Sequence, residues 1–456
     1  MEDFDPLYAI SPVDGRYHSK CQDIRPIFSE FGLIRFRLMV EIAWLKALAA
    51  HPDIKEVPPL SPQTVKQLDQ ISQKFSLEDA QRVKNIELTS NHDIKAVEYF
   101  LKEKSQDTQE LASISEFVHF ACTSEDINNL AYALMIRTAR SQCLIPAMDE
   151  IINTIKTLSQ EHADVAMLSR THGQPATPTT VGKEFANVVV RLQRQREQLR
   201  RTSIMGKLNG AVGNFNAHIH TYPEVNWPKL AQHFVESLGI DYNPMTTQVE
   251  PNDATVELLH ILQRFNSILL DFCVDIWGYI ALDYFQQKPV AGEVGSSVMP
   301  HKINPIDFEN AEGNLGVANS ILNYMAGKLP LSRWQRDLTN STVLRNLGVG
   351  IAHSLIAYQS TMKGLHKLDI NHQRISDDLN NNWVVLAEAI QTTMRRYGLE
   401  QPYEQLKALT RGKKVDQATL QAFVDGLDLP PEAKERLRSL TPASYIGNAK
   451  DQADNL

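Results

Sequence analysis

Glycine and proline are missing from long parts of the chain. No glycine occurs between Gly32 and Gly173, and no proline occurs between Pro62 and Pro146. Because both residues interrupt helices and form turns, their absence indicates long helices and argues against a series of short strands. Further proline-free segments cover residues 179–222, 252–288 and 331–401. The sequence therefore predicts an all-α fold.

Two long helices are expected in particular. Thr177 and Pro178 look like an N-cap followed by proline at the first helical position, and the helix would run from Val181 toward Gly206. The second helix starts near Asp253 and carries apolar residues around most of its surface, which is typical of a buried central helix. Thirty helical residues span roughly 45 Å. Helices of this length fit a long bundle.

A chain of 456 residues is too long for one compact core. Two places suggest domain boundaries, because the kind of residue changes there. The first precedes the segment from residue 119 to 126, and the second precedes the more polar tail after residue 365. We expect an N-terminal helical domain (residues 1–111), a central long-helix bundle (112–365) and a C-terminal helical domain (366–456).

Composition and charge exclude several functions. The net charge of −8 argues against a nucleic-acid-binding protein, which usually carries a basic face. Asp271 and Asp275 interrupt the most apolar stretch, so no membrane span is expected. The cysteines form no CxxC pair, and His218 and His220 lack partners with metal-ligand spacing. We therefore expect a cytoplasmic protein with no metal and no cofactor.

The segment 295–305, GSSVMPHKINP, concentrates polar groups in a loop. Ser296, Ser297, Lys302 and Asn304 supply two hydroxyls, an ammonium and an amide, which together can bind a carboxylate. Asn304 followed by Pro305 looks like the start of a helix, which adds affinity for anions. A polar surface loop that only caps a helix is equally compatible with these residues.

Three other segments place polar groups beside turns or helix starts. His172 precedes a glycine ahead of a long helix, and a near-neutral pKa suits imidazole to proton donation, although a lone histidine is more often structural. Thr123 and Ser124 read first as a helix cap followed by acids. The segment 90–93, SNHD, would pass as a turn.

Two arginine-containing segments carry groups that could bind a phosphate. SPVDGRY (residues 11–17) contains Arg16 and Tyr17, and the segment 332–346, SRWQRDLTNSTVLRN, adds further arginines and hydroxyls. Arginine matches phosphate oxygens with two parallel hydrogen bonds. Each segment taken alone would be a solvated surface.

Together these segments resemble one enzyme family. The loop at 295–305 resembles the signature GSSxMPxKxNP of the fumarase, aspartase and argininosuccinate lyase superfamily, whose members eliminate fumarate from a succinyl group. THGQPATP, TSxD, NHD, SPVDGRY and SRWQRDLTxSTVLRN resemble the adenylosuccinate lyases within it. The resemblance runs from Ser11 to about Gly447.

The resemblance assigns roles to individual residues. It implies that Ser296 is the base that removes the β-proton of the succinyl group and that His172 is the general acid; which of Ser296 and Ser297 faces the substrate stays open. The implied substrate-binding residues are Arg16, Tyr17, Asn91, His92, Asp93, Thr123, Ser124, Gln248, Lys302, Asn304, Asn310, Arg336, Ser341, Thr342 and Arg345.

The resemblance also implies the reaction and the assembly. Fumarate would be eliminated from adenylosuccinate, giving AMP, and from succinylaminoimidazole-carboxamide ribotide, giving the carboxamide ribotide, both in purine synthesis. It implies a homotetramer with active sites shared between subunits, and neither nucleic acid nor membrane as a partner. The alternatives are another fumarate-releasing lyase, such as argininosuccinate lyase, and a non-catalytic structural protein of the same fold.

Overall fold

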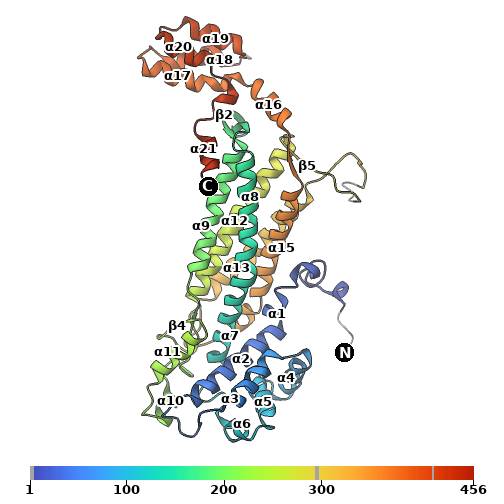
Figure 1. The fold of residues 1–456 in the computed structure, drawn as a ribbon, viewed down its shortest axis with the longest axis vertical. Helices are drawn as coiled ribbons and strands as arrows, with labels where there is room; N and C mark the ends of the chain where they lie inside the picture. The colour runs from blue at the N-terminus through green and yellow to red at the C-terminus, as the bar shows by residue number, and fades with distance from the viewer. Residues whose placement is uncertain (1–4, 293–296, 413–414) are drawn as a thin grey trace. The chain divides into compact units, whose positions relative to one another are not determined.

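The structure, a computed structural model, describes residues 5–292, 297–412 and 415–456 (Figure 1). These residues are mostly helical, which confirms the predicted all-α class, and they also form three two-stranded sheets that were not predicted. The chain divides into two compact units. Unit 1 comprises Met1–Met148, Gln195–Ser267 and Gly313–Gln359, and unit 2 comprises Asp149–Arg194, Ile268–Glu312 and Ser360–Leu456. The predicted three-domain division stays a prediction.

The glycine-free run between Gly32 and Gly173 forms most of the helices that belong to unit 1 alone. The helices of unit 1 alone are α1 (Arg25–Phe28), α2 (Glu30–Ala49), α3 (Pro62–Gln73), α4 (Leu77–Ser90), α5 (Asp93–Ser105), α6 (Gln109–Ser113), α7 (Ser124–Ala139), α10 (Asn216–Thr221), α11 (Trp227–Ser237) and α14 (Thr339–Leu344). A two-stranded parallel sheet, β3 (Met205–Gly206) with β4 (Asp241–Tyr242), also lies in this unit.

Local capping fixes where the helices of unit 1 begin. The Ser29 hydroxyl accepts a hydrogen bond from the backbone N–H of Gly32 and so caps α2. Ser76 and Asp79 cap α4 reciprocally, because each side chain accepts from the backbone N–H of the other. These short-range signals set the helix boundaries independently of packing.

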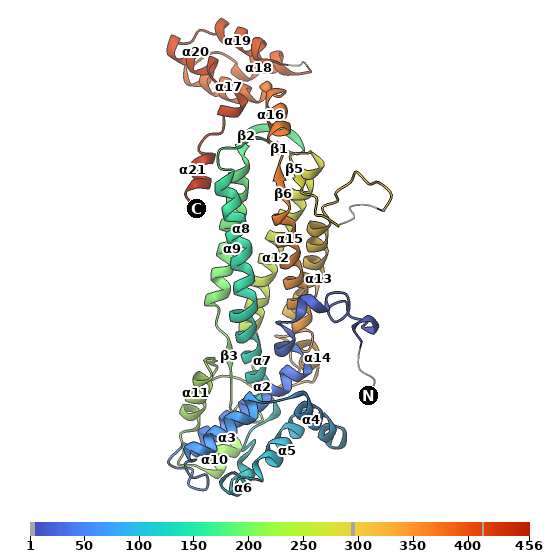
Figure 2. The same cartoon turned by 45° about the vertical axis from the view of Figure 1, so that its right-hand side comes forward.

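Five long helices contribute residues to both units and can be followed in Figure 1 and Figure 2. The longest, α12, has 29 residues, which corresponds to about 44 Å. Leu262, Phe265 and Leu269 of α12 are fully buried, as expected of a central helix, whereas Trp277 is exposed. The five helices are α8 (Ile145–Glu161), α9 (Val181–Arg201), α12 (Asp253–Ala281), α13 (Ile306–Lys328) and α15 (Leu347–His366).

Within unit 1, a buried polar group connects three of these helices. The side-chain amide nitrogen of Asn266 in α12 donates to the Ser354 hydroxyl of α15 at 2.9 Å and to Asn319 of α13 at 3.1 Å. Its oxygen accepts from the hydroxyl of Tyr358 at 2.7 Å. Because a buried amide without partners is costly, this network favours one register of the three helices.

In unit 2, β1 (Ala166–Thr171) and β2 (Gln174–Thr180) form an antiparallel hairpin. The expected N-cap at Thr177 and Pro178 is wrong, because both residues lie in β2. The hydroxyl of Thr180 instead accepts from the backbone N–H of Lys183 and caps α9. That helix ends at Arg201, short of the expected Gly206.

The remainder of unit 2 contains a second hairpin and a C-terminal helical region with its own apolar core. Leu386, Ile390, Met394, Leu420 and Val424 belong to this core. The strands are β5 (Phe285–Gln287) and β6 (Leu368–Ile370), and the helices are α16 (His372–Asn380), α17 (Ala387–Arg396), α18 (Pro402–Thr410), α19 (Gln417–Gly426), α20 (Pro431–Arg438) and α21 (Ala449–Asp454).

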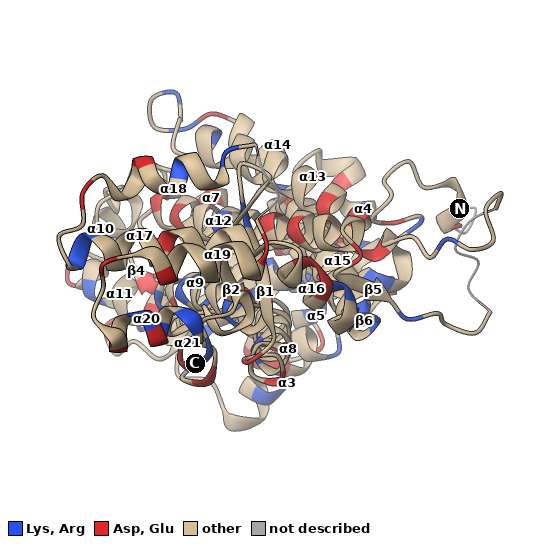
Figure 3. Ribbon diagram, turned by 90° about the horizontal axis from the view of Figure 1, so that it is seen from above, with Lys and Arg blue, Asp and Glu red and all other residues tan. Residues whose placement is uncertain are grey.

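Charged residues are interspersed along the helices. In Figure 3, the Lys and Arg residues are scattered among the Asp and Glu residues over the described chain. None of the described helices combines the length and apolarity that crossing a membrane requires.

Candidate active site

A pocket of about 500 Å³ in unit 1 brings together segments that are far apart in the sequence. It is formed where α4 meets α5, at the N-terminus of α7, and by the segment around α14. Most of its lining residues were predicted to bind substrate. The predicted residues in the pocket are Asn91, His92, Asp93, Ser124, Arg336, Ser341, Thr342 and Arg345, and Glu87, Asn128 and Leu338 complete the lining.

The junction between α4 and α5 places three of these residues. Asn91 ends α4 in a left-handed conformation with φ of 50°, which asparagine tolerates better than most residues. His92 then caps α5, because its Nδ1 accepts from the backbone N–H of Lys95 at 3.2 Å. Asp93 occupies the first turn of α5, where its negative charge suits the helix dipole.

The N-terminus of α7 is held by a buried ion pair. Asp126 accepts from the backbone N–H of Thr123 at 2.8 Å, as a capping residue should. Its carboxylate also contacts Nζ of Lys207 at 2.8 Å, and both side chains are fully buried. The backbone N–H groups of Asn209 and Gly210 donate to the same carboxylate. Asp126 therefore fixes Thr123 and the pocket residue Ser124.

The segment before Thr123 is fixed by a second buried acid. Nδ1 of His119 lies 2.6 Å from a carboxylate oxygen of Glu41 in α2. Burial disfavours the charged imidazole, but the carboxylate of Glu41 outweighs this effect, so the pKa of His119 is raised. His119 has φ of 62°, a conformation that the contact with Glu41 helps to hold.

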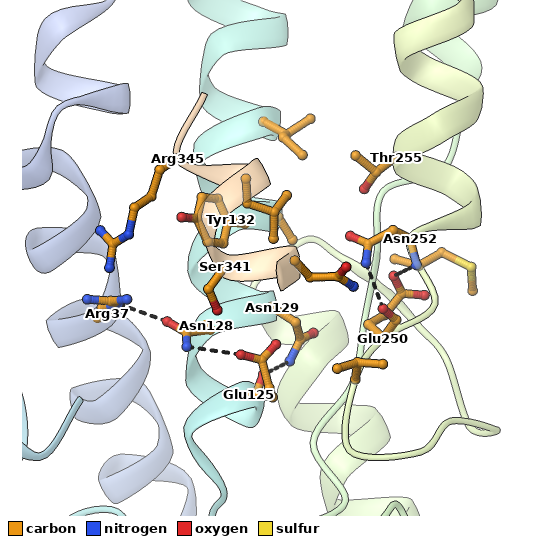
Figure 4. Close-up of a pocket in the computed structure, with 16 residues that line it drawn as sticks. Arg37, Glu125, Asn128, Asn129, Tyr132, Glu250, Asn252, Thr255, Ser341 and Arg345 are labelled. Atoms are coloured by element: carbon orange, nitrogen blue, oxygen red, sulfur yellow. Dashed lines mark hydrogen bonds between the residues drawn. The ribbon is translucent and has the colours of Figure 1, made fainter. Parts of the chain in front are cut away.

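Sequence reasoning missed Arg37, which lies buried beside the pocket. Its Nη2 contacts Asp93 at 2.7 Å. Its Nε donates to the side-chain oxygen of Asn128 at 2.9 Å, as Figure 4 shows. Arg37 and Glu41 are one turn apart on the buried face of α2. Because buried charges require partners, charged residues on an otherwise apolar helix face are the signal that could have found them.

Carboxylates hold the two pocket arginines. Arg336 contacts Glu125 at 3.2 Å and donates to Gln248, another predicted substrate residue, at 3.0 Å. Arg345 contacts Glu30 at 2.8 Å and Asp93 at 3.4 Å.

Asp93 therefore lies between two guanidinium groups, those of Arg37 and Arg345. Burial raises the pKa of Asp93, but these two positive charges and a backbone hydrogen bond outweigh burial, so the pKa is lowered. The carboxylate of Asp93 is thus charged, and it accepts hydrogen bonds from Arg37 and from the backbone N–H of Ile94. As a contact of substrate it stays a prediction.

The other predicted residues lie outside this pocket. Arg16 is exposed, and the hydroxyl of Tyr17 lies 3.5 Å from the side-chain nitrogen of Asn314 in unit 1. In unit 2, Lys302 is exposed and Asn304 is half-buried just before α13. Asn310 of α13 accepts a hydrogen bond from the Ser360 hydroxyl at 2.8 Å. Ser296 lies outside the described residues.

His172 lies at the tip of the β1–β2 hairpin in unit 2, and its side chain is exposed. His172 and Gly173 have φ of 53° and 73°, as a two-residue hairpin turn with positive φ at both positions requires. Arg170 contacts Asp378 of α16 at 2.6 Å, and the Tyr284 hydroxyl donates to the same carboxylate. The hairpin that carries His172 is therefore anchored within unit 2.

Metal ligands are not grouped in the described residues, where no cluster of three or more His, Cys, Asp or Glu side chains could hold a metal ion. Beside the carboxylates of Glu87 and Asp93, the pocket offers guanidinium groups, hydroxyls, two amides and an imidazole. Such a set binds anions through charge-assisted hydrogen bonds.

Comparisons with known proteins agree with this chemistry. A lyase family model matches residues 15–319, and a model described as adenylosuccinate lyase C-terminal matches residues 332–446. The chain is 60% identical over 450 residues to an adenylosuccinate lyase of Escherichia coli (strain K12), with 99% of each chain covered. It is 58% identical to one from Haemophilus influenzae, also with 99% of each covered.

The chain belongs to the adenylosuccinate lyase family.

Membership of the adenylosuccinate lyase family confirms the predicted family and the predicted class of enzyme, a carbon–nitrogen lyase. Two solved structures share the fold. A fumarate lyase from Mesorhizobium sp. BNC1 has a TM-score of 0.77 at 18% identity, covering 95% of this chain and 97% of that one. A 3-carboxy-cis,cis-muconate lactonizing enzyme from Pseudomonas putida has a TM-score of 0.74 at 21% identity, covering 95% of both chains. These likenesses confirm the predicted fold.

Proposed function

We propose that the pocket of unit 1 binds a succinyl-nucleotide and that this enzyme eliminates fumarate from it. The substrates are adenylosuccinate, which gives AMP, and succinylaminoimidazole-carboxamide ribotide, which gives the carboxamide ribotide, both in purine nucleotide synthesis. The observation that carries the proposal is the convergence of Arg336, Arg345, Ser341 and His92 on one pocket of about 500 Å³. A ligand with a phosphate and two carboxylates needs several cationic and hydroxyl donors at once.

In the proposed mechanism, Ser296 takes the β-proton of the succinyl group. The electrons of the broken C–H bond form the double bond of fumarate as the bond between carbon and nitrogen breaks. His172 donates a proton to the departing nitrogen. Lys302 and Asn304 hold the carboxylates, where negative charge develops before the carbon–nitrogen bond breaks. The exposed position of His172 on an anchored hairpin supports its role, because the ring is accessible and its backbone is held.

The proposed assembly is a homotetramer whose active sites combine residues of different subunits. Apolar side chains exposed on α12 and α13 support an oligomer, since such side chains on the helices of one chain commonly mark subunit contacts. Val274, Trp277, Val317 and Tyr324 are 42%, 48%, 45% and 62% exposed.

The free thiols of the cysteines support a cytoplasmic location for the enzyme.

Incubation of the pure protein with adenylosuccinate should release fumarate and AMP in equal amounts. Argininosuccinate, supplied in parallel at the same concentration, should release no fumarate, because it has no phosphate for the pocket arginines. Absorbance and chromatography of the products measure both reactions. Fumarate release from argininosuccinate alone would contradict the proposed substrate.

Mixing two inactive variants tests the shared sites. Ser296→Ala and His172→Ala subunits should each be inactive alone but regain part of the wild-type rate after subunit exchange, because some sites then receive an intact serine and an intact histidine from different chains. Each variant exchanged with itself is the control. If the mixture stays inactive after mass spectrometry has verified mixed tetramers, each site draws both residues from one chain.

A further inference from the structure

The arginines that line the pocket are already engaged by carboxylates of the same unit. Arg336 contacts Glu125, and Arg345 contacts Glu30 and Asp93. A ligand that brings its own negative charge to one of these arginines must displace or share the carboxylate already there. The strength of each existing pair therefore affects how tightly an anion binds.

The pair of Glu125 and Arg336 is the more protected of the two contacts with glutamate. The Glu125 side chain is 12% exposed and that of Arg336 is 24% exposed. Glu30 and Arg345 are each 41% exposed, so water and salt screen their attraction more strongly. Of these glutamates, we therefore expect Glu125 to affect anion binding more.

A chain of hydrogen bonds that starts at the buried Arg37 holds the Glu125 carboxylate in place. The side-chain nitrogen of Asn128 donates to Oε1 of Glu125 at 3.1 Å, the oxygen that Arg336 also contacts. The side-chain oxygen of Asn128 accepts from Nε of Arg37 at 2.9 Å. In Figure 4, Asn128 lies between Arg37 and Glu125 with its two ends directed at them. Glu125 is therefore held where it meets Arg336.

Gln248 occupies another nitrogen of the same guanidinium group. Its side-chain oxygen accepts from Nη1 of Arg336, and its nitrogen donates to the backbone oxygen of Ala211. Arg336 is thus oriented by a neutral partner on one nitrogen and by a charged partner on the other. Removal of the charge of Glu125 would leave Gln248 to orient the guanidinium group.

We propose that Glu125 is a specificity-determining residue that competes with an anionic group of the ligand for Arg336. The inference rests on the proposed location of the succinyl-nucleotide in this pocket. The competing group is a carboxylate of the succinyl portion or the phosphate of the nucleotide. Glu125 weakens the binding of every anion to Arg336. It therefore disfavours ligands that make few other contacts with the pocket, and it speeds the release of products.

Glu125→Gln tests the proposal, because it removes the negative charge and keeps an oxygen that can accept from Asn128. One of the two products should bind the variant roughly three- to thirty-fold more tightly than the wild type, since a competing charge a few ångströms away is lost. Isothermal titration with AMP reports on the phosphate, and titration with fumarate reports on the carboxylate. The product that gains affinity identifies the group bound by Arg336.

Glu87→Gln is the matched control. Glu87 lines the same pocket but pairs with Lys84, at 2.5 Å, so its replacement removes a charge from the pocket without releasing an arginine. Its gain in product affinity should be clearly smaller than that of Glu125→Gln, because no arginine loses a partner. Equal gains in the two variants would overturn the proposal in favour of a general field effect. Unchanged or weaker binding of both products to Glu125→Gln would overturn it by showing that Glu125 only orients Arg336.

Arg336→Ala separates this inference from the proposed function. Loss of affinity for one product in that variant, without a gain in Glu125→Gln, overturns only the role of Glu125. Full affinity for both products in Arg336→Ala overturns the proposed binding site as well. If Glu125→Gln folds poorly, Glu125→Asp provides the second measurement, because it withdraws the same charge from Arg336 and should give a smaller gain. No gain in that variant would overturn the proposal too.

Discussion

Replacement of His172 by asparagine should lower the turnover number about a hundred- to ten-thousand-fold, the usual contribution of a general acid. Asparagine suits this position structurally, because it tolerates the left-handed conformation that His172 adopts at φ of 53°. It lacks a group that donates a proton near neutral pH. The free energy of unfolding should therefore stay close to that of the wild type. Steady-state kinetics with adenylosuccinate and urea denaturation measure the two quantities.

His220→Asn is the control for this substitution. His220 is an exposed histidine in α10, in unit 1, and has no proposed role in the reaction. Its replacement should leave the turnover number within about twofold of the wild type. Turnover near the wild-type rate in His172→Asn would show that another group protonates the leaving nitrogen.

Replacement of Asp126 by asparagine should cost about 3–5 kcal/mol of the free energy of unfolding, because it leaves the ammonium group of Lys207 buried without its negative partner. Lys207→Met should cost less. In that variant the carboxylate keeps hydrogen bonds from the backbone N–H groups of Thr123, Asn209 and Gly210. Urea denaturation at one fixed protein concentration measures the difference.

The double variant Asp126→Asn with Lys207→Met is the control for the ion pair. It should recover part of the loss seen in Asp126→Asn, since no unpaired charge is then buried. Asp126→Asn should also reduce turnover, because Asp126 fixes Thr123 and Ser124 at the start of α7. A loss of stability below about 1 kcal/mol would show that Lys207 finds another partner or gains access to water.

The candidate site could be predicted only in part. Asn91, His92, Ser124, Arg345 and other residues from separate motifs do converge on one pocket. Their roles stay predictions, and so does that of Ser296, which lies outside the described residues. The motifs were recognisable because each pairs donor groups with a turn or a helix start, and these are short-range signals.

Other features of the site depend on packing between segments far apart in the chain. Arg37 reaches Asp93 and Asn128 only because α2, α5 and α7 come together in unit 1. Glu125 looked like an ordinary acid in a first helical turn, and its contact with Arg336 joins positions more than two hundred residues apart. Hydrophobic periodicity does not specify which charges meet.

The error at Thr177 and Pro178 has the same origin. A threonine followed by proline is a valid helix start, but in this chain the two residues lie within β2, where its pairing with β1 is irregular, and Thr180 provides the cap. The hairpin was missed because its strands are stabilised by partners across the turn and not by local propensity.

The sequence by itself determined the helical class, since the absence of glycine and proline over long runs leaves few alternatives to helix. It also determined which chemical groups the motifs carry, and hence the family. Only the tertiary structure decided that His172 stands at the tip of an anchored hairpin, that Asp126 is buried with Lys207, and that each pocket arginine meets a carboxylate. These contacts depend on long-range packing, whereas helix formation and capping depend on neighbours in the chain.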